Sequence, residues 1–109
     1  MKRVTVEEVR EAIQRIGFNL RPKVTLDRKA RECCPLGALC LDRGVKFSGL
    51  DIGRDYKDGF IHGFDYPELP SMKSVLDATR YTEGVADGMA LHEFYLQTIS
   101  QGGSDGSQG

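Results

Sequence analysis

The sequence contains one glycine-spaced pattern twice, Tyr-x-x-Gly-x-x-x-Gly, first in YKDGFIHGFD (56–65) and again in YTEGVADGMA (81–90). The two glycines of each copy are four residues apart, so on a helix they lie on one face. Each glycine in a helix interior costs about 1 kcal/mol relative to alanine, so we expect a compensating contact. Small residues at this spacing let two helix backbones approach closely. The repeat therefore predicts two closely packed helices, and their contact residues would be Gly59, Gly63, Gly84 and Gly88.

Two arrangements of these glycine stripes are compatible with the sequence. In the first, the stripes face each other within one chain, and the short connection between them suggests antiparallel helices. In the second, a stripe faces a second subunit and the protein forms a homodimer. Tyr56 and Tyr81 precede the first glycine of each copy by three residues, so their rings would cover the neighbouring helix, and each hydroxyl would need a partner. We favour the first arrangement because two matching stripes in one chain can satisfy each other.

Two shorter helices are predicted in the first half of the chain. Thr5 and Glu8 form a capping box at the start of a helix over residues 6–16. Pro35 suits the first turn of a second helix, over residues 35–43, because its missing N–H group has no intrahelical role there.

The remaining elements complete a mainly α-helical fold class. A third helix is predicted to begin near residues 50–51 and to end at the prolines that follow it. A fourth helix is predicted over about residues 72–99, either continuous or broken near 79–82. Extended segments at 24–26 and 45–47 could form a short two-stranded β ribbon. We therefore expect a single small domain of about four helices, with or without that ribbon.

The domain is expected to cover residues 1–100. A chain of 109 residues suits one domain. The Gly/Ser-rich stretch over 101–109 has no apolar side chain, so it cannot offset its ordering entropy and is predicted to be a disordered tail.

The cellular location is predicted to be the cytoplasm. No apolar run approaches the roughly 20 residues that cross a bilayer, so no membrane association is expected. The N-terminus lacks the apolar segment of a secretory signal. The three cysteines are an odd number, and two of them are adjacent, which does not suit a disulfide framework.

Cys34 is the candidate reactive thiol. It lies at the predicted N-terminus of the second helix and near the basic residues of 28–31, and both features lower the pKa of a thiol. Nothing in the sequence brings His62 or His92 near it as a base. The alternative is that the cysteines are small buried apolar residues. Cys34 and Cys40 would lie about 120° apart around a shared helix, so they do not converge on a metal ion. No metal and no cofactor are expected.

Arg28, Lys29 and Arg31 are the candidate anion-binding residues. They belong to a basic segment over 21–31 that has five Lys/Arg, one Asp and no aromatic residue on which a nucleic-acid base could stack. Residues 1–31 hold nine Lys/Arg and four Asp/Glu, whereas residues 32–109 hold six and twelve. Such asymmetry can reflect two solvated faces of one fold, steer a partner or pair two copies of the chain.

Three sequence blocks carry a resemblance to other proteins: Cys-Pro-Leu-Gly-Ala-Leu (34–39), Tyr-x-x-Gly-Phe-x-x-Gly-Phe-Asp (56–65) and Tyr-x-x-Gly-x-x-Asp-Gly (81–88). Their order resembles that in small uncharacterised proteins of bacteria and their phages. The resemblance implies a bacterial or phage origin, and it supplies no activity or substrate.

The first functional hypothesis is a non-enzymatic module that binds another protein, such as a phage-type or accessory protein that binds a host protein. It is motivated by the absence from the sequence of a nucleophile–base pair, clustered carboxylates, a phosphate loop or a metal set. The first alternative is a thiol-dependent redox or nucleophilic activity at Cys34. The second is a weak nucleic-acid contact through residues 21–31, which the missing aromatic residues disfavour.

Overall fold

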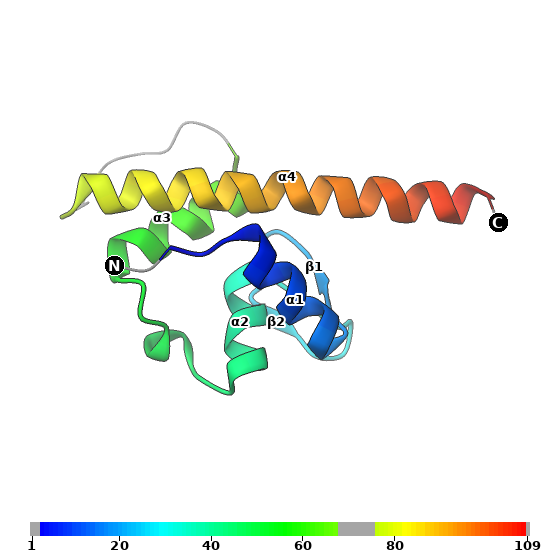
Figure 1. Ribbon diagram of the computed structural model, residues 1–109, viewed down its shortest axis with the longest axis horizontal. Coiled ribbons are helices and arrows are strands. Elements are labelled where there is room, and N and C mark those ends of the chain that lie inside the picture. The colour runs from blue at the N-terminus through cyan, green and yellow to red at the C-terminus, as the bar shows by residue number, and fades with distance from the viewer. Residues whose placement is uncertain (1–2, 68–75, 109) are drawn as a thin grey trace.

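Helices dominate the computed structural model, which describes residues 3–67 and 76–108, with side chains as far as Ile99 (Figure 1). The described helices are α1 (Val6–Ile16), α2 (Pro35–Arg43), the 3-10 turn η1 (Phe47–Gly49), α3 (Arg54–Asp65) and α4 (Ala78–Gln108). The described strands are β1 (Asn19–Leu20), β2 (Leu26–Asp27) and β3 (Glu32–Cys33). The predicted fold class, a single small domain that is mainly α with about four helices, is confirmed.

Helices α1 and α2 have the boundaries expected from their capping residues. The Thr5 hydroxyl accepts a hydrogen bond from the Glu8 backbone N–H at 3.1 Å, and the Glu8 carboxylate accepts one from the Thr5 N–H at the same distance. Gly17 and Gly44, which follow the two helices, adopt φ angles of 71° and 69°. These angles lie in the left-handed region that glycine enters without strain. Local sequence therefore determines both ends of both helices.

The small sheet corrects the predicted ribbon. Its strand order is β1-β3-β2, with β1 parallel and β2 antiparallel to β3. Leu26 pairs with Cys33, whereas the segment predicted as its partner, 45–47, leads into the 3-10 turn η1. The physical reason is that β3 runs directly into α2, and the Cys34 N–H beyond it still donates to the carbonyl of Thr25 at 3.2 Å. The residues just before α2 therefore form hydrogen bonds with the extended segment around Leu26.

Helix α3 begins later than the sequence predicted. Its first residue is Arg54, not residue 50 or 51, and its N-cap is Gly53 with a φ of 81°. Leu50 and Ile52 lie in the extended segment before the helix and are 7% and 3% exposed. Burial of these two side chains from a non-helical segment, together with the left-handed Gly53, delays the start of the helix.

The two glycine stripes lie against each other at the contact between α3 and α4. A Cβ atom at Gly59 would lie 2.2 Å from the Tyr81 carbonyl oxygen, and one at Gly63 would lie 2.3 Å from that of Val85. Since both positions advance together, the two helices run parallel (Figure 1). The antiparallel arrangement expected from the sequence is therefore wrong. At these distances no other residue fits without displacing a backbone.

The same contact has a local twofold relation, in which residues 25 apart in the sequence exchange roles between α3 and α4. Gly84 is the counterpart of Gly59, and a Cβ atom there would lie 2.1 Å from the carbonyl oxygen of Tyr56, the counterpart of Tyr81. Gly88 likewise would place its Cβ 2.2 Å from the Phe60 carbonyl oxygen. Two copies of one pattern at equal register explain the parallel arrangement, because each copy supplies the glycines that the other copy's backbone requires.

Helix α4 is continuous through residues 79–82, where the sequence allowed a break. It begins at Ala78 because the Asp77 carboxylate accepts a hydrogen bond from the Arg80 N–H at 3.1 Å, as an N-cap does. The part of the predicted helix over 72–75 lies outside the described residues.

The C-terminal part of α4 covers the segment that the sequence predicts as a tail. The structure continues the helix to Gln108, and Gly109 lies outside the described residues. The division into a domain over 1–100 and a disordered tail over 101–109 stays a prediction. Among residues 3–67 and 76–108, no helix combines the length and the apolar character that a membrane span requires.

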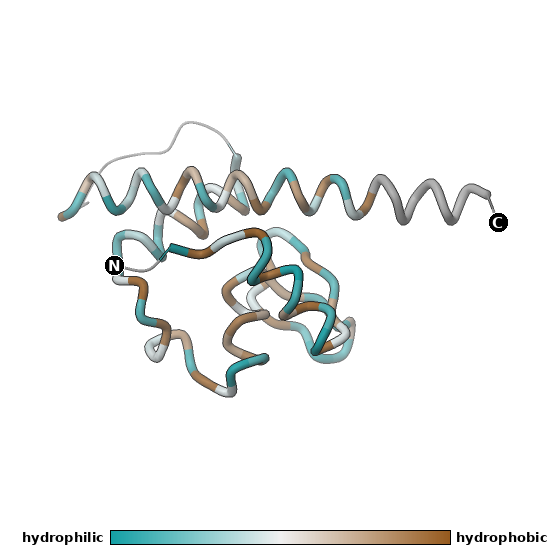
Figure 2. Tube along the Cα trace, in the orientation of Figure 1, coloured by the Kyte–Doolittle hydropathy of each residue, from teal (hydrophilic) through white to brown (hydrophobic). Residues whose placement is uncertain are grey.

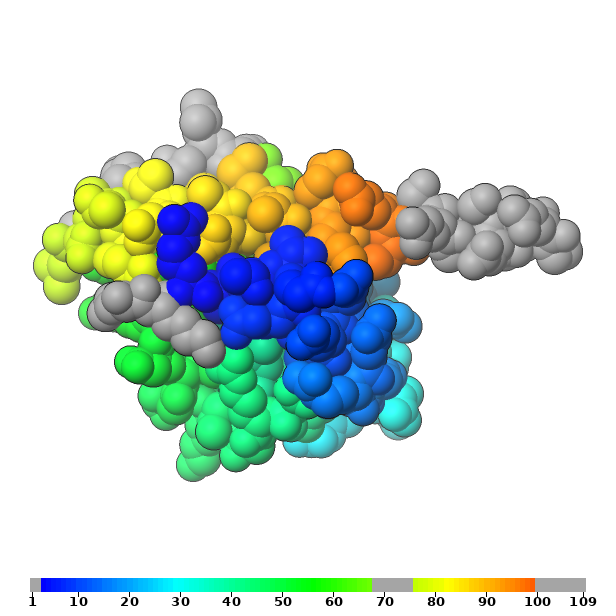
Figure 3. Space-filling view, viewed as in Figure 1, coloured from blue at the N-terminus to red at the C-terminus, as the bar shows by residue number. Residues whose placement is uncertain are grey.

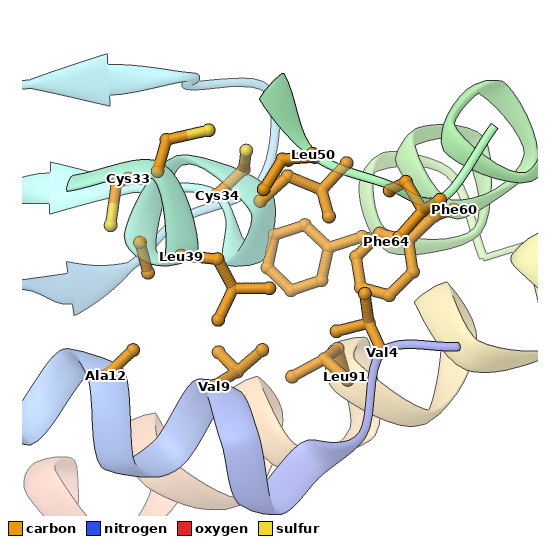
Figure 4. Close-up of a cluster of buried hydrophobic side chains, with 14 of the residues drawn as sticks. Val4, Val9, Ala12, Cys33, Cys34, Leu39, Leu50, Phe60, Phe64 and Leu91 are labelled. Carbon is orange, nitrogen blue, oxygen red and sulfur yellow. The ribbon is translucent and has the colours of Figure 1, made fainter. Parts of the chain in front are cut away.

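The hydrophobic core lies where the four helices meet. Figure 4 shows Val9 of α1, Leu39 of α2, Phe64 of α3 and Leu91 of α4 in this cluster, and each is at most 2% exposed. Figure 2 shows the apolar run through the middle of α2, the helix that the core surrounds most fully. The two N-terminal helices are thus joined to the α3–α4 pair through side chains, whereas α3 and α4 touch through their backbones.

Candidate functional site

The first candidate, Cys34, lies inside the protein at the N-terminus of α2. Its side chain is the N-cap of the helix, with the Sγ accepting a hydrogen bond from the Gly37 N–H at 3.2 Å. The residue is only 8% exposed and lines a cavity of about 70 Å³. The cavity wall is mostly apolar, with Phe60 and Phe64 of α3 among its members. The sequence placed this cysteine correctly at a helix start, and its burial came from the packing of α3 over that start.

The ionisation of Cys34 runs opposite to the sequence-based expectation. Burial raises the pKa of the Cys34 thiol to about 11, although the backbone N–H groups of Gly37 and Leu36 act to lower it. The charge of Asp65 raises the pKa further. Desolvation therefore outweighs the helix N-terminus, since the thiolate would form in an apolar enclosure. At neutral pH the side chain is a thiol and not a nucleophilic thiolate.

The other cysteines are also buried. Cys33 is fully buried, and burial raises its thiol pKa to about 12. Cys40 is 9% exposed, and burial raises its pKa as well. All three are free thiols. Their surroundings agree with the interpretation of cysteine as a small apolar core residue.

Neither histidine lines the cavity that holds Cys34. His92 on α4 is partly buried, and its Nδ1 lies 2.7 Å from the carbonyl oxygen of Phe64, to which it can donate a hydrogen bond. In the described part of the chain, no group of three or more His, Cys, Asp or Glu side chains could hold a metal ion. The arrangement around Cys34 thus supplies a thiol in an apolar cavity, without an adjacent imidazole.

The predicted packing residue Tyr56 takes part in a polar network that the sequence did not reveal. Its hydroxyl accepts a hydrogen bond from the Val4 N–H at 2.6 Å and donates one to the Asp87 carboxylate at 2.5 Å. Arg3 forms two hydrogen bonds to the same carboxylate, at 2.8 and 2.9 Å. Figure 3 shows the N-terminal segment lying across α4 at this place. The network holds the start of the chain on the α3–α4 pair, which is a structural role.

The three candidate anion-binding residues have different surroundings. Arg31 has a φ of 57°, and its Nε donates to the Gly17 carbonyl at 3.3 Å. Its guanidinium also lies over the ring of Phe18, 5.5 Å from the ring centre. Arg28 and Lys29 are exposed, and neither has an ion-pair partner within residues 3–67 and 76–108. Arg31 is therefore engaged in the fold, while the other two cations face solvent.

A surface hollow lies beside the basic segment, between strand β2 and the C-terminal end of α2. We call it the β2–α2 hollow, and its volume is about 260 Å³. The residues that line it are Leu26, Arg28, Cys40, Leu41, Gly44, Val45 and Lys46. Leu26 and Val45 are 38% and 39% exposed, so both keep apolar area open to solvent in this depression.

Nothing in the sequence marked Leu26, Val45 and Lys46 as functional candidates. The sequence allowed Leu26 and Val45 to lie in the two segments of a short β ribbon. The hollow exists because the strand partner of Leu26 is Cys33 and the chain at Val45 takes a different path. No local sequence signal distinguishes an exposed Val45 from a buried one.

Comparison of the chain with protein-family models, with curated proteins and with solved structures gave no match.

Proposed function

We propose that this protein is a non-enzymatic module that binds another protein through the β2–α2 hollow. The observation that supports the proposal is the pair of exposed apolar side chains, Leu26 and Val45, that share one concave surface. Binding surfaces combine such an apolar centre with a polar rim, and here Arg28 and Lys46 supply the rim. The hollow is small, so the partner would contribute a short segment or a single anchoring side chain.

The chemistry of Cys34 gives less support to the thiol-dependent alternative. A nucleophilic or redox cysteine needs access and thiolate character, whereas Cys34 is 8% exposed and its thiol pKa is raised to about 11. A protein-binding role makes no such demand on the thiol. We therefore assign the cysteines to the core in this proposal.

Nucleic-acid contact is the second candidate function, supported by the exposed Arg28 and Lys29. These two side chains could bind phosphate groups, and affinity that depends on them would decrease steeply with salt. The contact would leave Leu26 and Val45 unused, because phosphate contacts need no apolar partner. That difference separates the two functions by experiment.

The proposed function is tested by affinity capture from a lysate of the source cells with three immobilised proteins. They are the parent, the double variant Leu26→Ser/Val45→Ser, and the control Leu96→Ser on α4. Leu96 is 42% exposed, so the control removes an apolar side chain of similar exposure from another surface. We expect a protein that is retained by the parent and the control and lost by the double variant. Capture of the same proteins by all three would contradict a role for the hollow.

A further inference from the structure

We propose that the β2–α2 hollow recognises an acidic peptide segment, with a bulky apolar side chain seated between Leu26 and Val45 and carboxylates against Arg28 and Lys46. The inference rests on the proposed function and adds the chemical class of the partner. The occupant is a segment of another protein that carries Asp or Glu beside Leu, Ile, Phe or Met.

The apolar part of this recognition comes from two elements that meet at the hollow. Leu26 belongs to β2, and Val45 follows the left-handed Gly44 at the end of α2. Cys40 and Leu41 of α2 also line the hollow, and Cys40 is 9% exposed. An apolar side chain placed here would contact atoms on several sides, as an anchoring residue does in a protein interface.

The charge preference follows from which charged groups near the hollow already have partners. Asp42 is bound by Arg15 through hydrogen bonds of 2.7 and 2.9 Å, and this contact lowers the pKa of its carboxyl group. Arg43 is paired with Glu8 at 2.9 Å. These two ion pairs leave no net charge to oppose an anionic ligand.

The remaining charges at the hollow favour an anion. The Asp27 carboxylate next to the hollow accepts a hydrogen bond from the Ala30 N–H at 3.0 Å. Arg28 and Lys46 line the hollow itself, and no ion pair joins either of them to another described side chain. Lys29 adds a further exposed cation next to Arg28. The Asp27 carboxylate keeps its negative charge, but the three cations Arg28, Lys29 and Lys46 outnumber it. The net charge at this surface is therefore positive, which complements a segment rich in Asp and Glu.

The apolar centre favours a peptide over a nucleic acid. Leu26 and Val45 offer nothing to a phosphate group, and the hollow has no aromatic ring on which a base could stack. A second copy of the chain could also offer exposed apolar side chains, which are Tyr66, Leu76, Met89, Leu96 and Ile99, and it is therefore tested as a separate occupant. Both occupants are outcomes of the experiment below.

The experiment is a selection of displayed random peptides of about 12 residues on the immobilised parent protein, a length that spans a short recognition segment. We expect enrichment of peptides with two or more acidic residues beside a bulky apolar one. A fluorescent synthetic copy of the most enriched peptide then serves as the probe. Its affinity is measured for the parent, for Leu26→Ser/Val45→Ser and for Arg28→Glu/Lys46→Glu.

We expect each double variant to lower the affinity for the probe peptide by about tenfold or more, as loss of an interface anchor does. The matched controls are Leu96→Ser and Arg54→Glu, which alter an exposed apolar side chain and an exposed cation away from the hollow. Both controls should bind like the parent. All of the altered side chains are partly or largely exposed, and equal melting temperatures will verify that the variants are folded.

Five results would overturn the inference. Failure to enrich acidic peptides, or binding that survives both double variants, removes the acidic ligand from this site. Enriched peptides without acidic residues that depend only on Leu26 and Val45 would refute the charge preference and leave the proposed function in place. Binding of a mixed-sequence DNA duplex that is lost only in Arg28→Glu/Lys46→Glu would assign the cations to nucleic acid. A doubled mass in light scattering that Leu26→Ser/Val45→Ser abolishes would assign the hollow to a second copy.

Discussion

The α3–α4 contact and the β2–α2 hollow differ in how they use side chains. At the contact, glycines remove side chains so that two backbones touch, and a Cβ atom at Gly84 would lie 2.1 Å from the Tyr56 carbonyl. At the hollow, Leu26 and Val45 keep large apolar side chains in a depression where 38% and 39% of each remains exposed. The first surface is complete within the chain, and the second has unused apolar area. The comparison teaches that the most conspicuous sequence pattern serves the fold, while the proposed binding surface carries no pattern.

The largest expected loss of stability comes from placing a side chain in the α3–α4 contact. Gly84→Leu and its counterpart Gly59→Leu should each destabilise the protein by more than about 3 kcal/mol, the upper end of ordinary overpacking, because a backbone must move to admit the side chain. Chemical denaturation measures the free energy of unfolding. The control is Ala86→Leu on the exposed side of α4, which should change stability by less than about 0.5 kcal/mol. Glycine variants as stable as the parent would show that the helices separate easily.

A smaller loss of stability should distinguish the two tyrosines, although they hold equivalent places in the repeated pattern. Tyr56→Phe removes a buried hydroxyl that joins the Val4 N–H to Asp87 and should destabilise the protein by about 1–3 kcal/mol. The matched variant is Tyr81→Phe, whose hydroxyl has no hydrogen bond to another described residue, and it should change stability by less than about 0.5 kcal/mol. Equal losses in the two variants would mean that the network around Asp87 adds nothing.

Alkaline pH should destabilise the folded protein through its buried thiols. The pKa of Cys34 is raised from 9.0 to about 11, so the folded state holds its proton more tightly than the unfolded state does. The corresponding stability is fully present below about pH 9 and is lost as pH rises through about 11. Melting temperatures across this range should decrease, and Cys34→Ala should reduce the decrease. A thiol reagent should also label native Cys34 more slowly than free cysteine at neutral pH; faster labelling would revive the thiol-dependent alternative.

The smallest effect is expected at the end of α4. Deletion of residues 102–109 should leave the melting temperature unchanged within about 1 °C, because this stretch has no apolar side chain to bury. The measurement is a thermal melt of the shortened and full-length chains, followed by circular dichroism. A lower melting temperature for the shortened chain would contradict the predicted boundary at residue 100 and assign the C-terminal turns of α4 to the domain.

Local signals predicted the helices well because the chemistry that ends a helix lies within a few residues. Thr5 with Glu8 marked the start of α1, and Gly44 marked the end of α2, each at the residue observed. The prediction failed where distant segments compete. The strand partner of Leu26 depended on the path of β3 into α2, and the start of α3 depended on the burial of Ile52 ahead of it.

The candidate sites divide in the same way. The helix N-terminal position of Cys34 was evident from the following proline, but its raised pKa arises from burial. Phe60 and Phe64 of α3, which line the same cavity, are distant in the sequence. The exposure of Leu26 and Val45 likewise arises from which strands pair. Neither desolvation nor exposure can be determined from neighbours in sequence.

The sequence by itself determined the helix boundaries at the capping residues and the closeness of the two glycine stripes, because both depend on short-range stereochemistry. Only the tertiary structure decided that α3 and α4 run parallel, with each copy of the pattern matched to the other at an offset of 25 residues. It also decided that Cys34 is enclosed while Leu26 and Val45 stay open to solvent. The physical reason is that direction, desolvation and exposure depend on which distant surfaces meet, and that choice depends on the energy of the whole fold.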